Sequence, residues 1–311
     1  MSEYYAQEID LSDYSGRIFV VGDLYGSYRL FCQLLDSAGI KDGEEAVVIA
    51  TGNLFDNCSI DRRKMSERYE EPLSMMKAIN TGNFSGKLIR FYSVKGASEQ
   101  AMIRAIPTIT AGNYKFVHNT FLRETWRKNG GGWHDHHSRY LLDKELKQLV
   151  AHQLPLIFKI VLRHGHKLGV VSAELPQIRD DFDLIFSAFS MFDADTANLY
   201  LNTCLYGSES APEKLRIKGV EALFCGMHRI SDIRKKMGLK RSVKPVCMGN
   251  TIFLNSSADK LVDGDKYSAI SMLEVVPNQK LSMKLYQLTI TDGNIVRTMK
   301  TKFNHDGDVY E

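Results

Sequence analysis

Seven residues decide the fold of this chain: Val20-Val21-Gly22-Asp23-Leu24-Tyr25-Gly26. They overlap the β-branched run Arg17 to Val21, which is typical of a buried strand, and they precede Tyr28 to Ala38, where apolar residues recur at helical spacing up to Gly39. A strand, a glycine-containing turn and an amphipathic helix form a βα unit. Polar residues at such a turn lie beyond the carboxyl end of a strand, where open α/β sheets gather their ligands.

Two more segments repeat this arrangement. Glu45 to Ala50 predicts a strand that ends in Thr51-Gly52-Asn53, and Lys87 to Val94 predicts one that ends in Lys95-Gly96-Ala97-Ser98 before a helical pattern resumes near Glu99. Strands also dominate the second half of the chain. The expected ones are Leu156 to Leu162, Lys167 to Ser172, Ala222 to Cys225, Thr251 to Asn255, Ala269 to Val275 and Lys284 to Thr291.

The middle of the chain, residues 113–154, lacks strand periodicity. It contains Asn129-Gly130-Gly131-Gly132-Trp133 and a helical pattern from Asp143 to His152, so we expect a helical excursion there. No linker rich in Pro, Gly or Ser divides the chain, and no internal repeat is visible. We therefore expect residues 1–311 to form one domain.

The composition is that of an ordinary globular protein, with 44% hydrophobic and 25% charged residues. A formal charge of +3 is too small for the whole surface to attract nucleic acid or membrane. Five cysteines at no zinc-ligand spacing indicate reduced thiols. No signal pattern opens the sequence and no apolar stretch approaches the roughly 18 residues of a membrane span, so we expect a cytoplasmic protein without a membrane partner.

The three glycine-containing loops, taken together, resemble the motifs of the phosphoprotein phosphatase (PPP) family of calcineurin-like metallophosphoesterases. Gly22 to Gly26 resembles G-D-x-H-G, Gly52 to Asn57 resembles G-D-x-x-D-R, and Lys95 to Glu99 resembles R-G-N-H-E. The order and the approximate spacing also match. This resemblance implies an α/β fold, a calcineurin-like metallophosphatase sandwich of two mixed β-sheets flanked by helices.

Later segments are similar to the bacteriophage lambda phosphatase branch of that family. The matching segments are Asn129 to Trp133 (N-G-G-x-W), Leu154 to Ile157 (L-P-L), Val170 to Pro176 (V-x-H-A), Ile217 to Gly219 with Phe224 to Arg229 (F-G-H-T-P), and Ile252 to Ser256 (I-D-T-G). The resemblance therefore covers most of the chain.

The departures from the family pattern fall on its chemical groups. The family binds two divalent cations that activate a bridging water, while a His-Asp pair serves the leaving group and an Arg holds the phosphate. Carried over position by position, only the first metal-binding Asp is kept, as Asp23. The replaced positions are Tyr25 (His), Asn53 (bridging Asp), Ala97 (Asn), Ser98 (proton-donating His, beside Asp56), Ser172 and Met227 (His), and Asn57 (phosphate-holding Arg).

These replacements are adverse to metal binding and proton transfer. Asn53 offers one neutral oxygen where two dications need a shared anion, and Met227 is a soft thioether unsuited to manganese or magnesium. A serine such as Ser98 does not titrate near neutrality. We expect no cofactor, or at most one weakly bound divalent cation such as Mn²⁺ held by Asp23 with Asp56 and Glu99. Otherwise Asp23 accepts hydrogen bonds from loop amides. A one-residue slip would put His228 in place of Met227.

The sequence thus predicts a pseudophosphatase, a catalytically inactive protein that binds a protein partner, with a phage origin and a host target suggested by analogy. One alternative is a weak mononuclear serine/threonine phosphatase or phosphoesterase that uses Asp23. Another is nucleic-acid binding through the basic insertion at residues 229–244, which could equally be a solvated helix face. The partner-binding candidates in this basic segment are Arg229, Arg234, Lys235, Lys236, Lys240, Arg241 and Lys244.

Two groups of histidines fit surface positions better than metal sites. His134, His136 and His137 lack the spacing of a closed zinc site, so we interpret them as part of a solvated loop. His164 and His166 flank Gly165 in an expected turn between two strands, where exposure is the default. Two further apparent insertions, residues 61–71 and 192–214, are candidate partner-binding loops or decoration.

Overall fold

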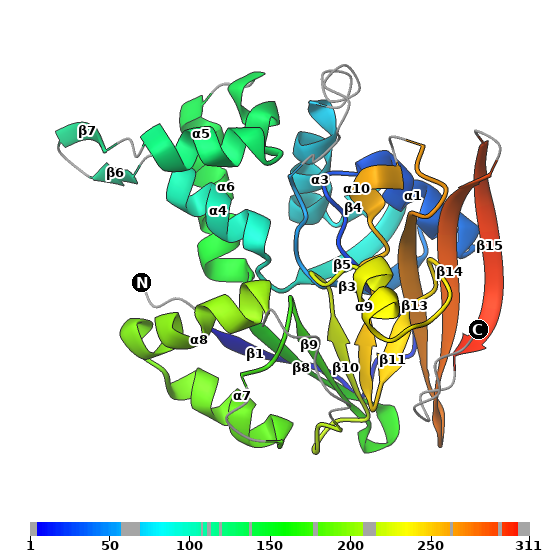
Figure 1. Cartoon of the computed structure of the whole chain (residues 1–311). Helices are drawn as coiled ribbons and strands as arrows, with labels where there is room; N and C mark the ends of the chain where they lie inside the picture. The colour runs from blue at the N-terminus through cyan, green and yellow to red at the C-terminus, as the bar shows by residue number, and fades with distance from the viewer. Residues whose placement is uncertain are drawn as a thin grey trace.

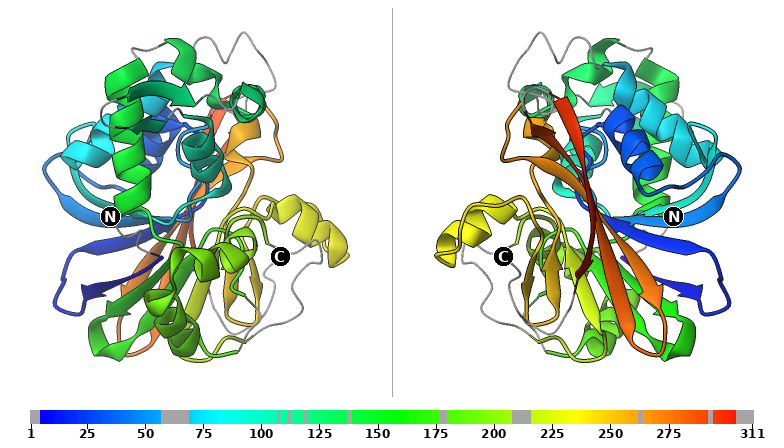
Figure 2. Two further views of the ribbon diagram at one scale, coloured as in Figure 1. Left: turned by 90° about the vertical axis from the view of Figure 1, so that its left-hand side faces the viewer. Right: turned by 90° about the vertical axis from the view of Figure 1, so that its right-hand side faces the viewer.

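The fold is described from a computed structural model of the chain (Figure 1). The structure describes residues 5–56, 69–106, 108–110, 113–117, 120–136, 139–176, 180–207, 216–261, 264–291 and 294–303. Two β-sheets lie face to face at the centre, and helices cover their outer faces (Figures 1 and 2). No helix in these described ranges is long and apolar enough to cross a membrane.

One sheet has seven strands and contains the first βα unit. Its spatial order is β15 (Asn294–Phe303), β14 (Leu281–Thr291), β13 (Ala269–Pro277), β2 (Arg17–Val21), β3 (Glu45–Ala50), β5 (Lys87–Ser93) and β4 (Asn83–Phe84). Strands β2, β3 and β5 are parallel, so their carboxyl ends meet at one edge. Strand β13 runs antiparallel to β2, which makes the sheet mixed.

The other sheet has six strands and is also mixed. Its spatial order is β1 (Ala6–Leu11), β8 (Ile157–Leu162), β9 (Lys167–Val171), β10 (Ala222–Cys225), β12 (Thr251–Phe253) and β11 (Val246–Met248). Strands β9, β10 and β12 are parallel neighbours. Strand β8 runs antiparallel to β9 but parallel to β1, and β11 runs antiparallel to β12. The carboxyl ends of β9, β10 and β12 supply the later loops of the resemblance.

Alternate residues of the strands build the core between the sheets. Val20 and Val47 face Phe158 and Phe224 in one buried cluster, whereas Phe19 of β2 packs on the opposite side with the helices. Because β2 and β3 are covered on both faces, they read as continuous apolar runs in the sequence. This packing fixes where the loops beyond these strands begin.

Helices cover the two outer faces. The seven-stranded sheet packs against α1 (Tyr28–Ser37), α3 (Glu70–Thr81) and α4 (Ala97–Ala105), and beside them lies an insert of α5 (Thr120–Lys128), the 3-10 helix η1 (Gly131–His136) and α6 (Arg139–Gln153). The six-stranded sheet packs against α7 (Phe182–Met191), α8 (Ala194–Tyr206) and α9 (Ile230–Lys236). The 3-10 turn η2 (Arg163–Gly165) and the helix α10 (Ala258–Leu261) complete the set.

The predicted fold class, an α/β sandwich of two mixed sheets flanked by helices, is confirmed by this topology. The expected strands are present with ends shifted by a few residues at most, but four strands of the two sheets were missed: β1, β4, β11 and β15. Strand β1 was missed because its sequence AQEIDL is mostly polar and only Ile9 and Leu11 are buried. The predicted helical excursion 113–154 was wrong at its start. Strand β7 (Asn113–Val117) pairs there with β6 (Thr108–Thr110) in a local hairpin.

The inter-sheet core predicts the stability effect of one substitution. Phe158 is fully buried and its ring meets Tyr92 of the opposite sheet at 6.2 Å between centroids. Phe158→Ala should lower the free energy of unfolding by about 3–5 kcal/mol, because it removes a ring and leaves a cavity. Leu199→Ala, at a position that is 76% exposed, should stay within about 0.5 kcal/mol of the parent. Denaturant titrations measure both, and equal effects would contradict this packing.

Candidate functional site

The loops at the carboxyl ends of the parallel strands meet at one place. Asp23 follows β2, Asn53 follows β3, Met227 follows β10 and Asn255 follows β12, so both sheets contribute. The backbones approach closely there. A Cβ atom on Gly96 would lie 2.3 Å from the Asn53 nitrogen, and one on Gly226 would lie 2.1 Å from Oδ1 of Asp23. Only glycine, which has no Cβ atom, fits at these two positions, and this explains why the loops contain glycine there.

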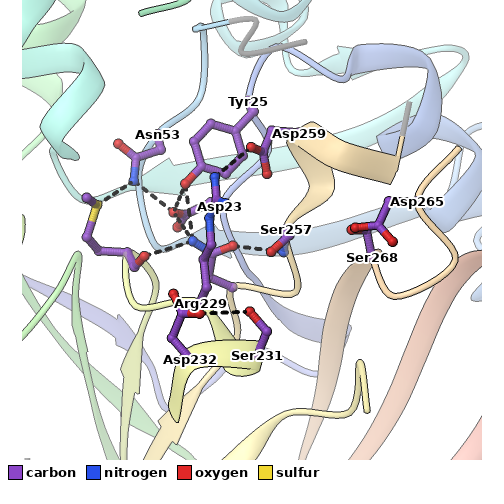
Figure 3. A network of polar contacts seen from close by, with 12 residues as sticks. Asp23, Tyr25, Asn53, Arg229, Ser231, Asp232, Ser257, Asp259, Asp265 and Ser268 are labelled. Carbon is purple, nitrogen blue, oxygen red and sulfur yellow. Dashed lines mark hydrogen bonds and ion pairs between the residues drawn. The ribbon is translucent and has the colours of Figure 1, made fainter. Parts of the chain in front are cut away.

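The Asp23 carboxylate is the centre of this site (Figure 3). Its Oδ1 accepts a hydrogen bond from the Thr51 hydroxyl at 3.0 Å. Its Oδ2 accepts from the Tyr25 hydroxyl at 3.0 Å, from Nδ2 of Asn53 at 2.8 Å and from Nδ2 of Asn255 at 3.1 Å. Asp23 is buried, and all four of these donors are neutral side chains. Hydrogen bonds from neighbouring loop amides were expected, but these donors are side chains, two amides and two hydroxyls.

Backbone groups fix the orientation of both asparagine amides. The Ser98 N–H donates to Oδ1 of Asn53 at 3.0 Å, and the Ser257 N–H donates to Oδ1 of Asn255 at 2.9 Å. Nδ2 of Asn255 also donates to the Met227 carbonyl at 2.9 Å. A backbone N–H can only donate and a carbonyl can only accept, so each amide turns its NH₂ group toward Asp23. Asn53 therefore presents a hydrogen-bond donor to Asp23. In the family that the sequence resembles, this position is the carboxylate that bridges two metal ions.

Two more buried carboxyl groups have partners of their own. Glu99 accepts from the backbone N–H groups of Leu54 at 2.7 Å and of Asn53 and Gly96 at 2.9 Å each, which ties the second loop to the third. Asp56 accepts from Nε1 of Trp126, on α5, at 2.9 Å. Asp56 and Glu99 thus do not join Asp23 around a cation. Asp56 instead fastens the helical insert to the site.

Burial shifts all three carboxyl groups toward protonation. Desolvation raises the pKa of Asp23 from 3.8 to about 7, although the hydrogen bonds from Asn53, Thr51 and Tyr25 act to lower it. Desolvation also raises the pKa of Glu99, and it raises the pKa of Asp56 well above its usual value. The negative charge of Glu99 adds to the upward shift of both aspartates.

The loop backbone is held in conformations that L-residues rarely adopt. Among the described residues other than glycine, six have a positive φ, and four of these belong to the network: Tyr25, Asn53, Met227 and Ser257. Such conformations cost of order 1–3 kcal/mol each and persist where surrounding contacts determine them. The hydrogen bonds around Asp23 are contacts of this kind.

The other positions that the resemblance singles out have the following surroundings in the described part of the chain. Met227 faces the network, with its sulfur 3.7 Å from Nδ2 of Asn53. His228 pairs instead with Glu174 at 2.7 Å, so the one-residue slip that would make it a ligand is wrong. Ser172 is fully buried, and its hydroxyl has no hydrogen-bond partner within the described ranges. Ala97 begins α4, and Asn57 lies outside the described residues.

The residues present do not fit a dinuclear metal centre. A cation at Asp23 would displace the donors that now fill its oxygens, and Asn53 would have to turn over against the bond from Ser98. The neighbouring thioether and alanine offer manganese or magnesium no ligand. Within the described part of the chain, no three His, Cys, Asp or Glu side chains gather as metal ligands would. The site is a hydrogen-bonded cluster built around one carboxyl group.

The basic segment is partly committed to internal contacts. Arg229 pairs with Asp259 at 2.8 Å. Arg234 was wrongly placed among the partner-binding candidates, because it is 2% exposed and its Nε donates to the Lys240 carbonyl at 2.6 Å. Its helical position faces the core, which the charge run alone did not reveal. Lys235, Lys236, Lys240 and Arg241 are exposed, and Lys244 is half-buried.

Two expectations about histidines were wrong. His134 is buried beside Trp126 and bonds Asp143 at 2.6 Å, so it belongs to the packing of the insert rather than to a solvated loop. His166 is also buried and contacts Glu221 at 3.1 Å. His136 stacks on Tyr69, His164 is exposed as expected, and His137 lies outside the described residues.

Of the two insertions, residues 61–68 and 208–214 lie outside the described ranges, and 194–206 form α8.

Sequence reasoning missed three residues of the site: Thr51, Asn255 and Trp126. Thr51 follows an expected strand and Asn255 is the last residue of another, so the rule that polar groups gather at strand ends could have found both. Trp126 had a weaker signal. The chain has two tryptophans, and both lie in the expected helical excursion.

The buried Asp23 predicts a pH dependence of stability. Its pKa is higher in the folded chain, at about 7, than in the unfolded chain, at 3.8, so its contribution is complete below about pH 4 and is lost as the pH rises to about 7. In Asp23→Asn this loss disappears. The free energy of unfolding of the variant should therefore rise relative to the parent by up to about 4 kcal/mol between pH 4 and pH 8. Urea titrations across this range measure the difference, and parallel pH profiles would contradict it.

Comparisons with known proteins find structural similarity alone. No protein-family model and no curated protein sequence matches the chain. A crystal structure described provisionally as a diadenosine tetraphosphatase aligns with a TM-score of 0.49 at 17% identity, over 90% of this chain and 97% of its own. The structure of Vacuolar Protein Sorting 29 from Cryptosporidium parvum aligns with a TM-score of 0.37 at 13% identity, over 93% and 97%. Likenesses this distant carry no inference about activity, and the α/β sandwich rests on the strand pairing itself.

Proposed function

We propose that this protein is a catalytically inactive member of the metal-dependent phosphoesterases, a pseudophosphatase, and that it acts by binding a protein partner. One observation carries the first half of this proposal. The Asp23 carboxylate is filled by four neutral hydrogen-bond donors, and two of them are amides whose orientation the backbone fixes. A site that turns NH₂ groups toward its remaining ligand is built to hold that carboxyl group, not a cation.

Proton transfer to a leaving group also lacks its side chain. Ser98 stands where the family has a histidine, and its hydroxyl donates to Glu99 at 3.0 Å. Asp56, which would orient that histidine, accepts from the indole of Trp126 instead. A general acid must titrate near the working pH and lie within reach of the leaving group. A serine hydroxyl does not titrate near neutrality, so Ser98 does not meet the first need.

The alternative of a mononuclear phosphoesterase is less well supported by the same contacts. It would use Asp23 as a metal ligand together with Asp56 and Glu99, but each of these groups is engaged with different partners.

The proposed binding role rests on two features of the chain: a well-packed two-sheet sandwich and a basic segment at its surface. A cytoplasmic location agrees with the free and buried state of Cys32, Cys204, Cys225 and Cys247. A phage origin remains a suggestion from the sequence resemblance.

A hydrolysis assay tests the loss of activity. Metal-stripped protein resupplied with manganese should hydrolyse a generic aryl phosphate no faster than buffer, because neither metal ligands nor a proton donor are in place. Asp23→Ala, measured alongside, should behave identically. Turnover above buffer in the parent that disappears in Asp23→Ala would overturn the proposal and would identify Asp23 as a working ligand.

A further inference from the structure

The exposed cations of the basic segment form one face together with a neighbouring loop. Lys235 and Lys236 lie at the end of α9, and Lys240 and Arg241 lie on the turn that follows. Arg241 reaches the loop before β13, where its guanidinium lies over the ring of Tyr267 at 3.6 Å from the centroid. This contact brings Lys266 to the same face. We call the set of Lys235, Lys236, Lys240, Arg241 and Lys266 the basic face. It lies on the protruding yellow helix of Figures 1 and 2 and beside it.

The backbone beneath the basic face is anchored to the core. On α9, Ile230 and Ile233 are buried against the six-stranded sheet. The buried Arg234 donates through Nε to the Lys240 carbonyl and so holds the turn against the helix. Farther along, the Val243 carbonyl accepts from Nε2 of Gln287 at 2.8 Å and from the Ser256 hydroxyl at 3.1 Å. A surface fixed in this way loses little freedom when it binds, which favours affinity.

Four of the five cations of the basic face are not paired with acids in the part of the chain that the structure describes. Within the described residues, Lys235, Lys240, Arg241 and Lys266 form no ion pair. Among the described acids nearest in sequence, Asp259 is paired with Arg229, and Asp265, next to Lys266, accepts from two neutral donors, the Tyr267 N–H and the Ser268 hydroxyl. Asp263 lies outside the described residues. Only Asp232 is an exposed acid on α9 itself. The face is therefore a net positive field over a chain whose total charge is only +3.

The single aromatic residue of this region favours a protein partner over nucleic acid. Single-stranded nucleic acids bind where successive bases stack on open aromatic rings. The ring of Tyr267 carries the Arg241 guanidinium on one face, and the Lys266 ammonium is 5.2 Å from its centroid. The ring thus serves to orient cations by cation–π contact. Oriented guanidinium and ammonium groups match carboxylates.

We propose that the basic face is a docking surface for a protein segment rich in Asp and Glu. The inference rests on the proposed function, because it names the chemistry of the partner that the inactive protein would bind. Carboxylates of such a segment would lie against Lys235, Lys240 and Arg241, with Tyr267 holding Arg241 in place. Exposed ion pairs are individually weak and screened by salt, so the binding is of moderate affinity and falls with ionic strength.

Fluorescence anisotropy with a labelled Asp/Glu-rich peptide tests this docking surface. The full chain should bind the peptide at low salt, and the variant Lys235→Glu/Lys240→Glu/Arg241→Glu should bind roughly tenfold more weakly or worse. The matched control is Lys41→Glu/Lys77→Glu/Lys280→Glu, which makes the same change in total charge at exposed positions elsewhere. It should bind within about twofold of the parent. Circular dichroism checks that both variants fold.

Three results would overturn the proposal: no peptide binding by the parent, equal losses in the two variants, or tighter binding of a single-stranded oligonucleotide than of the peptide at the same salt. The last result would assign the face to nucleic acid. None of these results bears on Asp23, because the peptide assay leaves that site intact. Conversely, hydrolysis of the aryl phosphate by the parent protein would contradict the proposal that the site is inactive, and it would not change the interpretation of the peptide-binding result.

Discussion

The carboxyl group of Asp23 is the point on which the arrangement of the loops depends. It accepts hydrogen bonds from residues that follow β3 and β12, and Asn255 passes the connection on to the carbonyl of Met227 after β10. These strands belong to both sheets, so one buried acid joins the carboxyl edges of the whole sandwich. The donors that make this connection are neutral, and they offset part of the cost of burying the carboxyl group.

The hydrogen-bonded connection through Asp23 accounts for several features at once. The positive φ angles of Tyr25, Asn53 and Met227 persist because hydrogen bonds and close backbone contacts hold them. The raised pKa of Asp23 follows mainly from burial. The bond from Trp126 to Asp56 packs the helical insert onto the same loops. The Asp23 cluster thus holds the loops together, and the proposed docking surface is the basic face, whose backbone is anchored by Arg234 and Val243.

The sequence predicted the sandwich well and its site in part. Buried parallel strands such as β2 and β3 are unmistakable because both of their faces are apolar, and the glycine motifs mark their carboxyl ends. Edge strands such as β1 cannot be recognised by a continuous apolar run, because a half-exposed strand can be largely polar. The sequence singled out Asn53 by residue type, but which of its amide atoms faces Asp23 depends on backbone groups that only the folded chain brings together. Arg234 was misjudged for a similar reason, because a charge run does not show which of its members turns inward.

The central claim is that donors, not cations, fill Asp23, and manganese binding tests it most directly. Electron paramagnetic resonance of Mn²⁺ added to the metal-free full chain reports the free ion. The account predicts that the free signal rises in proportion to added Mn²⁺ from the first addition, in the parent and in Asp23→Asn alike. Loss of one or two equivalents of signal in the parent, with recovery in Asp23→Asn, would show a working metal site and contradict the account.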